Sequence, residues 1–167
     1  MFRSGAFVAE HVTPTDESQV QPNGVDLTLG AVYEQVEPGH LGRSGKTVGE
    51  RLAVEPEPEE DESGGTGDGS GIPTYRLEPG GYVAEYAERV RIPDGHVGFV
   101  FPRSSLMRNS AMLHTAVWDA GYEGRGEGLL AVNHELHVEK GARFAQFVLA
   151  AADHEGTYEG DYQGERL

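Results

Sequence analysis

The residues best suited to chemistry lie in one block of the chain, residues 99–127. Its first half carries Arg103, Ser104 and Ser105 after an apolar run, and Arg108 follows about one helical turn later. A strand that ends here and opens a helical turn brings guanidinium forks, hydroxyls and free backbone N–H groups together, and such groups bind a polyphosphate. Arg-Ser-Ser triplets also occur in proteins without such a site, so the pattern alone does not decide.

The second half of the block places one carboxylate among aromatic rings, in the order Trp118-Asp119-Ala120-Gly121-Tyr122. Ala-Gly suits a tight turn, so we expect Asp119 and Tyr122 to face each other across a hairpin. A carboxylate there can accept a proton from water, and a tyrosine ring can stack on a sugar. From the residues alone, a turn aspartate that caps the hairpin is the simpler interpretation.

Two other motifs resemble known sites but miss the required spacing. Ser44-Gly45-Lys46-Thr47 matches the end of a phosphate-binding loop, yet the full pattern needs glycine where the chain has His40, so we predict a hairpin turn. His134-Glu135-Leu136-His137 has its histidines three apart, whereas a metalloprotease helix needs four and one face of a strand needs two. We therefore predict surface or turn histidines rather than metal ligands.

Short apolar stretches punctuated by Gly and Pro must position these groups. Gly (24) and Pro (9) together make up about a fifth of the 167 residues, which is typical of many short strands joined by turns. The pattern predicts an all-β sandwich or barrel with one helical turn at 104–108. The expected strands are 25–29, 32–36, 82–86, 97–101, 128–132 and 143–149.

We expect a single domain, residues 1–167, with two segments outside its core. Residues 55–71 are acidic and glycine-rich with no apolar side chain, so they cannot compensate the entropy of ordering, and we predict a flexible insertion. Residues 154–167 are also polar but carry Tyr158 and Tyr162. These aromatic rings suit a segment that docks onto a surface, and a frayed terminus is the alternative.

Charge excludes some functions. The chain has 28 acidic and 13 basic residues, a net charge of -15, and only two lysines, so we expect no nucleic-acid partner. Acids spread along the chain favour adaptation to high salt over an ordinary acidic protein. There is no cysteine, no apolar run long enough to cross a membrane, and no signal-peptide pattern at the start, so we expect no membrane partner and a cytoplasmic location.

Several pieces of the chain, in order and spacing, resemble the dCTP deaminase and dUTPase superfamily, and within it the archaeal dUTPase branch. The pieces are Pro22 to Gly30, Pro102 to Leu106, Thr115 to Gly124, Gly141 to Gln146 and Tyr162 to Gly164. The resemblance covers most of the chain apart from the acidic insertion. It implies a distorted jelly-roll (β-clip) fold, a homotrimer with active sites between subunits, a mobile C-terminal lid, and dUTP as substrate. It also implies Mg²⁺ held mainly by the triphosphate and water.

The resemblance assigns roles to the matching positions. Asp119 would activate the water that attacks the α-phosphorus, which releases dUMP and pyrophosphate, and Asp26 would support that water and its neighbours. Tyr122 would pack on the deoxyribose. The remaining roles are phosphate binding for Arg103, Ser104, Ser105, Arg108 and Gln146, base and sugar binding for Thr115, Ala116, Val117 and Trp118, and lid closure for Tyr162 and Gln163.

The same superfamily contains deaminases, so two activities compete. In deaminases a catalytic glutamate lies ten residues after the hairpin aspartate, where this chain has Leu129, which cannot transfer protons. Glu127 lies two residues earlier on the same face of a strand, so a local shift would bring it into the site. We expect a dUTP diphosphatase. The alternatives are a dCTP deaminase, alone or combined with dUTP hydrolysis, and a catalytically silent nucleotide-binding trimer.

Overall fold

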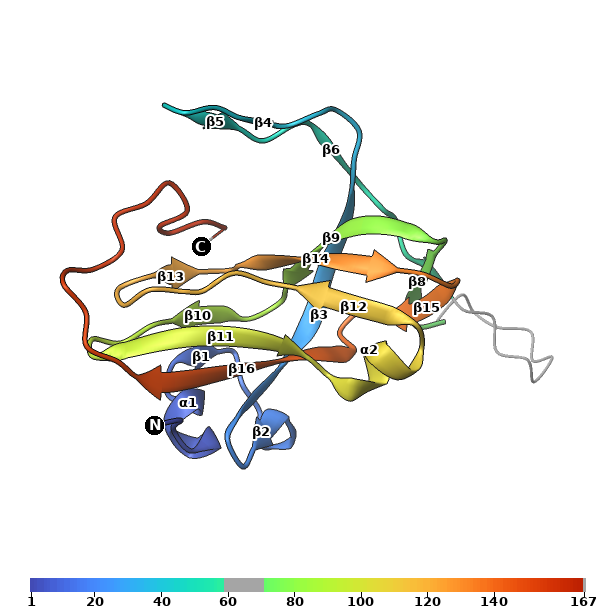
Figure 1. Cartoon of the computed structure of the whole chain (residues 1–167). Coiled ribbons are helices and arrows are strands. Elements are labelled where there is room, and N and C mark those ends of the chain that lie inside the picture. Colours follow the sequence, from blue (N-terminus) through green and yellow to red (C-terminus); the bar gives the residue numbers. More distant parts are fainter. Residues whose placement is uncertain (59–70, 167) are drawn as a thin grey trace.

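A computed structural model describes residues 1–58 and 71–166 (Figure 1). The helical elements are α1 (Gly5–Ala9), the 3-10 turn η1 (Glu17–Gln19) and α2 (Ser104–Arg108). The strands are β1 (Val12–Thr13), β2 (Val20–Gln21), β3 (Gly24–Gln35), β4 (His40–Leu41), β5 (Lys46–Thr47), β6 (Arg51–Ala53), β7 (Glu57–Pro58), β8 (Pro73–Leu77), β9 (Gly80–Tyr86), β10 (Arg89–Arg91), β11 (His96–Pro102), β12 (Ala111–His114), β13 (Glu123–Gly124), β14 (Glu127–Val132), β15 (Leu136–Glu139) and β16 (Arg143–Ala151). The all-β, jelly-roll-like fold expected from the sequence is confirmed.

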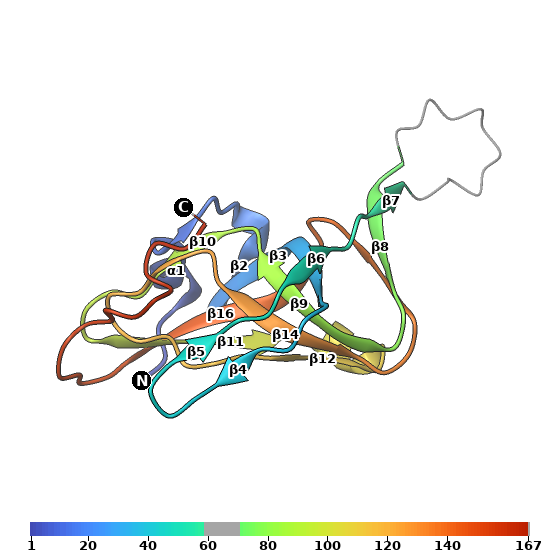
Figure 2. The same ribbon diagram turned by 90° about the horizontal axis from the view of Figure 1, so that it is seen from above.

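The largest sheet follows the order β11-β16-β3-β9-β14-β12, with β2 and β6 also paired to β3. Strand β3 joins its two halves, because residues Val25 to Thr28 pair with β16 and residues Leu29 to Glu34 pair with β9. In Figure 1 the β11–β16 pair forms a lower layer and the β9–β14–β12 group an upper one, with β3 passing between them. The hairpin β4–β5 and strand β6 lie over the upper layer (Figure 2).

Alternating side chains of these strands fill the space between the layers. On β3, Val25, Leu27 and Leu29 are at most 1% exposed, as the two-residue period of a strand requires. Tyr86 and Phe147 are also fully buried, and their rings both contact Trp118. Each such side chain stabilises the fold by about 1.5–3 kcal/mol through burial. The core therefore holds the hairpin around residue 118 in place.

Most sequence predictions for the elements hold. The stretches 25–29 and 32–36 fall on one long strand, β3, which ends at Gln35, one residue before the predicted end. The other four expected strands lie within β9, β11, β14 and β16. The helical turn at 104–108 is α2. Ser44 and Gly45 lie in the turn of the predicted hairpin, and Lys46 and Thr47 form its second strand, β5. Helix α1 was not predicted. Within the expected insertion, Glu57–Pro58 form β7, which pairs with β8, while 59–70 lie outside the described residues.

The histidines at 134 and 137 lie on the surface near the start of β15. His137 contacts the neighbouring Glu135, at 2.8 Å between Nε2 and Oε1. Among the described residues, no group of three or more His, Asp or Glu side chains is arranged to hold a metal ion. Within the same residues, no helix is both long and apolar enough to span a bilayer.

Candidate active site

The first group of predicted site residues surrounds the end of β11. Arg103 continues this strand in an extended conformation, its backbone N–H donates to the Phe144 carbonyl at 2.9 Å, and α2 starts at the next residue. Ser104 and Ser105 are exposed, while Leu106 is buried and anchors the turn. The serine hydroxyls and the Arg103 guanidinium therefore lie at one solvent-facing strand end.

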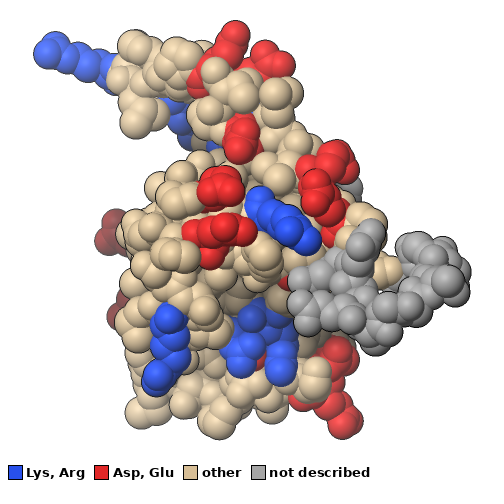
Figure 3. Space-filling view, turned by 90° about the vertical axis from the view of Figure 1, so that its right-hand side faces the viewer, with Lys and Arg blue, Asp and Glu red and all other residues tan. Residues whose placement is uncertain are grey.

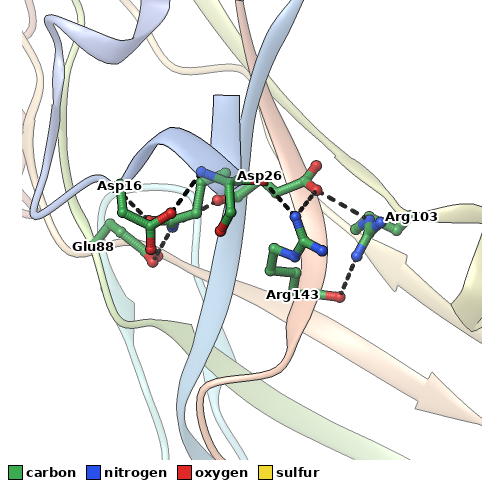
Figure 4. Close-up of polar contacts among 7 residues, drawn as sticks. Asp16, Asp26, Glu88, Arg103 and Arg143 are labelled. Atoms are coloured by element: carbon green, nitrogen blue, oxygen red, sulfur yellow. Dashed lines mark hydrogen bonds and ion pairs between the residues drawn. The ribbon is translucent and has the colours of Figure 1, made fainter. Parts of the chain in front are cut away.

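A buried carboxylate lies beneath this group (Figure 4). Asp26 on β3 is 2% exposed, and its Oδ2 lies 3.3 Å from Nε of Arg103 and 3.7 Å from Nη1 of Arg143. Burial raises the pKa of Asp26, and the two guanidinium groups oppose that rise. Arg103 also donates to the Arg143 carbonyl at 3.1 Å. Asp26 thus joins the ends of three neighbouring strands, β11, β16 and β3.

Two further predicted phosphate ligands differ in position. Gln146 lies opposite Asp26 on β3 and opposite Phe101 on β11, at the centre of this group. Arg108 ends α2, is exposed, and makes no ion pair within the described residues. On the face shown in Figure 3, two groups of basic side chains lie in the lower half, where few acidic side chains are seen, and other basic side chains lie near the centre and at the top. A protein of net charge -15 thus has a locally basic surface.

The second group of predicted residues forms a hairpin beside β11. The Thr115 hydroxyl donates to the Val100 carbonyl at 2.8 Å, and the backbone of Trp118 exchanges two hydrogen bonds with Gly98. Between these anchor points, the backbone groups of Ala116 and Val117 make no hydrogen bond within the described part of the chain. Their N–H and C=O groups are therefore available to a planar polar ligand such as a base.

A tight turn follows the hairpin segment. The Tyr122 N–H donates to the Asp119 carbonyl at 3.2 Å, and Gly121 between them has φ +88°. This is the conformation at the third position of a type II turn, which favours glycine. The Asp119 side chain is exposed and makes no hydrogen bond or ion pair with any described residue. Its carboxylate is free to accept a hydrogen bond from water.

The tight turn is as expected, but its two flanking side chains occupy different environments. Tyr122 is 5% exposed and packs between the rings of Trp118 and Tyr158, with centroids 5.3 and 5.6 Å away. Its hydroxyl donates to Oε1 of Glu165 at 2.8 Å. Burial, followed by this hydrogen bond, raises the pKa of Tyr122 well above its usual range, so the phenol stays neutral. The Trp118 ring is likewise packed against the core rather than directed to a ligand.

The C-terminal segment 157–166 explains why Tyr122 is buried. Its backbone pairs with the hairpin of the same chain, from the Tyr158 N–H to the Ala120 carbonyl at 2.7 Å and from the Gly164 N–H to the Glu123 carbonyl at 2.9 Å. The Gln163 side-chain amide donates to the Gly121 carbonyl at 3.1 Å. The predicted lid residue Gln163 therefore contacts the turn that follows Asp119.

The other predicted lid residue contacts the β4–β5 hairpin. Nζ of Lys46 lies 4.2 Å from the centroid of the Tyr162 ring and 3.3 Å from Oδ2 of Asp161. Both contacts are largely exposed, and such pairs contribute little to stability. The C-terminal segment is thus anchored mainly at residues 120–125 and only loosely at Tyr162.

The residue that a deaminase reaction would need is engaged elsewhere. Glu127 on β14 lies opposite Glu85 on β9, and its Oε1 accepts from Arg51 at 2.7 Å. Arg166 of the tail lies 3.0 Å from Glu127 and 2.7 Å from Glu85. Two guanidinium groups thus hold Glu127 in ion pairs, an arrangement unsuited to transferring protons. Leu129 is 49% exposed on the same strand.

Within one chain the two groups stay apart. Trp118 pairs with Gly98 near the start of β11, whereas Arg103 follows its end. Five residues of extended strand place Gly98, the partner of Trp118, about 17 Å from Arg103, and Asp119 follows Trp118 in the chain. The residues of each group lie near one another, but a single chain does not bring Asp119 and the Arg103 group together.

One residue close to the first group, Arg143, was not predicted from the sequence. It lies in the stretch Gly141 to Gln146, but a two-residue period places residues 143 and 146 on opposite faces of a strand. Arg143 faces this group because of a register shift in β16, and no local pattern in the sequence reveals that shift.

Comparison with known proteins identifies the family of the chain. Residues 4–152 match the family model described as dCTP deaminase-like, and the chain belongs to this family. A 2′-deoxycytidine 5′-triphosphate deaminase from Agrobacterium tumefaciens shares the fold, with a TM-score of 0.63 and 18% identity over 90% of this chain. The chain spans about half (48%) of the length of that protein.

Three relatives carry a more specific name. The chain is 57% identical over 166 residues to a probable deoxyuridine 5′-triphosphate nucleotidohydrolase of Halobacterium salinarum, covering 99% of this chain and 96% of the relative. A protein of the same name from Aeropyrum pernix is 42% identical over 89% of this chain and 87% of its own length. A deoxyuridine 5′-triphosphate nucleotidohydrolase of Methanocaldococcus jannaschii is 44% identical over 53% of this chain and 58% of its own length.

Proposed function

We propose that this protein is a dUTP diphosphatase, which hydrolyses dUTP to dUMP and pyrophosphate. The observation that supports this most directly is the Asp119 carboxylate, which is exposed and unpaired at a glycine-dependent turn. Relatives that share more than half of its residues over nearly the whole chain are named as enzymes of this activity. The exposed Asp119 carboxylate and the names of the relatives thus support the same reaction.

The chemistry assigns one role to each group. Asp119 accepts a proton from the water that attacks the α-phosphorus, and a positioned general base of this kind typically contributes about 10²–10⁴-fold to the rate. Negative charge develops on the phosphoryl oxygens, so donors that are already in place lower the barrier. Arg103, Ser104, Ser105, Arg108 and Gln146 supply these donors.

The hairpin selects the nucleoside. The free backbone groups of Ala116 and Val117, next to Thr115, bind the polar edge of the pyrimidine, while Trp118 holds the hairpin in position. Tyr122 packs on the deoxyribose once the C-terminal segment has moved from its ring. Tyr162 and Gln163 then belong to a segment that closes over bound nucleotide.

A homotrimer with sites between subunits explains the separation of the two groups. Asp119 of one subunit needs the Arg103 group of another, because the Trp118 end of the hairpin lies about 17 Å from Arg103 along β11. Large apolar side chains are exposed near both groups, namely Phe101 (49%), Met107 (59%) and Val117 (56%). Burying them between subunits would stabilise such an assembly.

We propose Mg²⁺ as the cation of the reaction. The absence of a cluster of three carboxylate or histidine ligands within the described residues fits a cation that keeps mostly phosphate oxygens and water as ligands. When bound, Mg²⁺ neutralises charge on the triphosphate. We also propose a cytoplasmic enzyme adapted to high salt, because screening reduces the mutual repulsion of a net charge of -15.

Product analysis tests this function. Purified protein is incubated with Mg²⁺ and either dUTP or dCTP, in high KCl and in dilute buffer. We expect dUMP and pyrophosphate from dUTP, with higher activity in high KCl. Conversion of dCTP would establish the deaminase alternative and give Glu127 a catalytic role despite its ion pairs. Nucleotide binding with no product in either reaction would establish the silent binder.

A variant pair tests the role of Asp119. Asp119→Asn keeps the size of the side chain and should lower kcat by about 10²–10⁴-fold while dUTP binding persists. Asp153→Asn is the matched control, because it makes the same change at an exposed aspartate without a partner in the described residues. Equal turnover of the two variants would remove Asp119 from the mechanism.

A further inference from the structure

A register shift in β16 determines which way Arg143 faces. Arg143 lies opposite Thr28 and Ala145 opposite Leu27, so two steps along β16 match one step along β3. Such a bulge inserts one residue and redirects the side chains that follow it. Phe144 and Ala145, at this shift, are both buried.

The bulge places several polar side chains on one face of the sheet. Residues directly opposite each other share a face, so Arg143 lies on the side of Thr28, and Gln146 on that of Asp26. Thr28 and Asp26 are two residues apart on β3 and therefore share that side. Arg143 thus joins Asp26 and Gln146, which a regular strand would not allow.

The buried Asp26 carboxylate contacts the guanidinium groups of both Arg143 and Arg103. Oδ2 of Asp26 lies 3.3 Å from Arg103 Nε and 3.7 Å from Arg143 Nη1, and it accepts no hydrogen bond from any described residue. Nη1 of Arg143 also donates to the Ser18 carbonyl. Each guanidinium has five N–H donors, so most remain unused. The Arg103 and Arg143 side chains are 35% and 38% exposed, whereas that of Asp26 is 2% exposed.

We propose that Arg143 is a second phosphate-binding guanidinium beside Arg103, and that Asp26 is the positioning residue for the pair. This inference rests on the proposed hydrolysis of a nucleoside triphosphate and specifies how its phosphate chain is held. Two guanidinium groups over one buried carboxylate leave a net positive charge that faces solvent. Because Asp26 fixes both groups in advance, less side-chain freedom is lost when the phosphates bind.

The proposal predicts which ligands depend on Arg143. Hydrogen bonds to charged groups contribute enough for Arg143→Gln to weaken triphosphate binding by about 10- to 100-fold. A non-hydrolysable imido analogue of dUTP should lose this affinity, whereas dUMP, which lacks the outer phosphates, should bind almost as before. Arg143→Lys restores the charge without the fork and should recover only part of the affinity.

Calorimetric titration of the full-length protein measures these affinities. Arg91→Gln is the matched control, because Arg91 is exposed and forms no ion pair in the described part of the chain. Thermal unfolding of each variant separates a loss of binding from a loss of fold. If Arg143→Gln binds the imido analogue and dUMP in the same ratio as Arg91→Gln, Arg143 is a structural residue only and the proposal is wrong.

A double-mutant cycle tests the role of Asp26. If Asp26 acts through the arginines, Asp26→Asn should weaken analogue binding in the wild type and much less in the Arg143→Gln background. Equal effects in both backgrounds would overturn the positioning role. If Asp26→Asn fails to fold, the Arg143 variants still decide the main point.

Inorganic tripolyphosphate separates this inference from the proposed function. Binding that weakens in Arg143→Gln but not in Arg91→Gln supports the arginine pair even in a protein that does not hydrolyse dUTP. Hydrolysis of dUTP with unchanged tripolyphosphate binding in Arg143→Gln would support the function and refute the pair.

Discussion

Gly121 connects the geometry of the proposed active site to the C-terminal segment. Its φ of +88° is one that other residues adopt only with strain, and a Cβ built on it would lie 2.8 Å from Cβ of Thr157. Gly121→Ala therefore strains the turn that carries Asp119 and also pushes the segment away. The two effects can be separated, because an alanine at another glycine of the chain would strain its turn without displacing a neighbouring segment.

That second glycine is Gly141, in the turn between β15 and β16. It has φ +84°, but a Cβ added to it would meet no atom within 4 Å. A left-handed conformation costs an alanine about 1–2 kcal/mol. For a protein of this size, each kcal/mol lowers Tm by about 2–4 °C, so both alanine variants should melt about 2–8 °C below the wild type.

Only Gly121→Ala should release the C-terminal segment. The collision displaces the residues whose hydrogen bonds reach the Ala120 and Gly121 carbonyls at 2.7 and 3.1 Å. Losing these two bonds costs about 1–3 kcal/mol, which raises the open population by about 5- to 150-fold. Amide hydrogen exchange of residues 157–166 measures that population. Similar protection in the Gly121→Ala and Gly141→Ala variants would refute the contact as the cause of docking.

Two further predictions concern the same segment and the same measurement. Burial raises the pKa of Glu165, although the hydrogen bond from Tyr122 opposes this rise. The contribution of Glu165 to docking is therefore complete below the ordinary glutamate pKa, and it is lost as pH rises through the raised pKa of the docked state. Glu165→Gln keeps the hydrogen-bond acceptor without the charge. Amide hydrogen exchange of residues 157–166, corrected for intrinsic rates, should therefore lose this pH dependence. An unchanged pH dependence would mean that another group causes it. Arg166→Gln removes both ion pairs to β9 and β14, and at this partly exposed site we expect about 1 kcal/mol, or about fivefold faster exchange. Arg125→Gln removes an exposed charge between β13 and β14 and should leave hydrogen exchange of the segment unchanged. Equal exchange in the Arg125→Gln and Arg166→Gln variants would exclude a specific role for Arg166.

The fold was predictable because its signals are local. Alternating apolar residues between glycines and prolines marked most of the long strands, and the Ala120-Gly121 pair marked the turn at Asp119. Arg103 at the end of a strand, followed by a helical turn, was predicted for the same reason. The continuity of β3 was not, because Gly30 separates two apolar runs yet fits within the strand at a close approach to Ala87.

The sequence by itself determined the residue types of the candidate site, the turn that exposes Asp119, and the strand end that presents Arg103. Only the tertiary structure decided that Arg143 faces Asp26, because the bulge depends on pairing between β16 and β3. It also decided that Tyr122 is covered by residues 157–166, and that Glu127 is held by two arginines. These contacts join residues far apart in the chain, and side-chain periodicity, which acts only over neighbouring positions, carries no information about them.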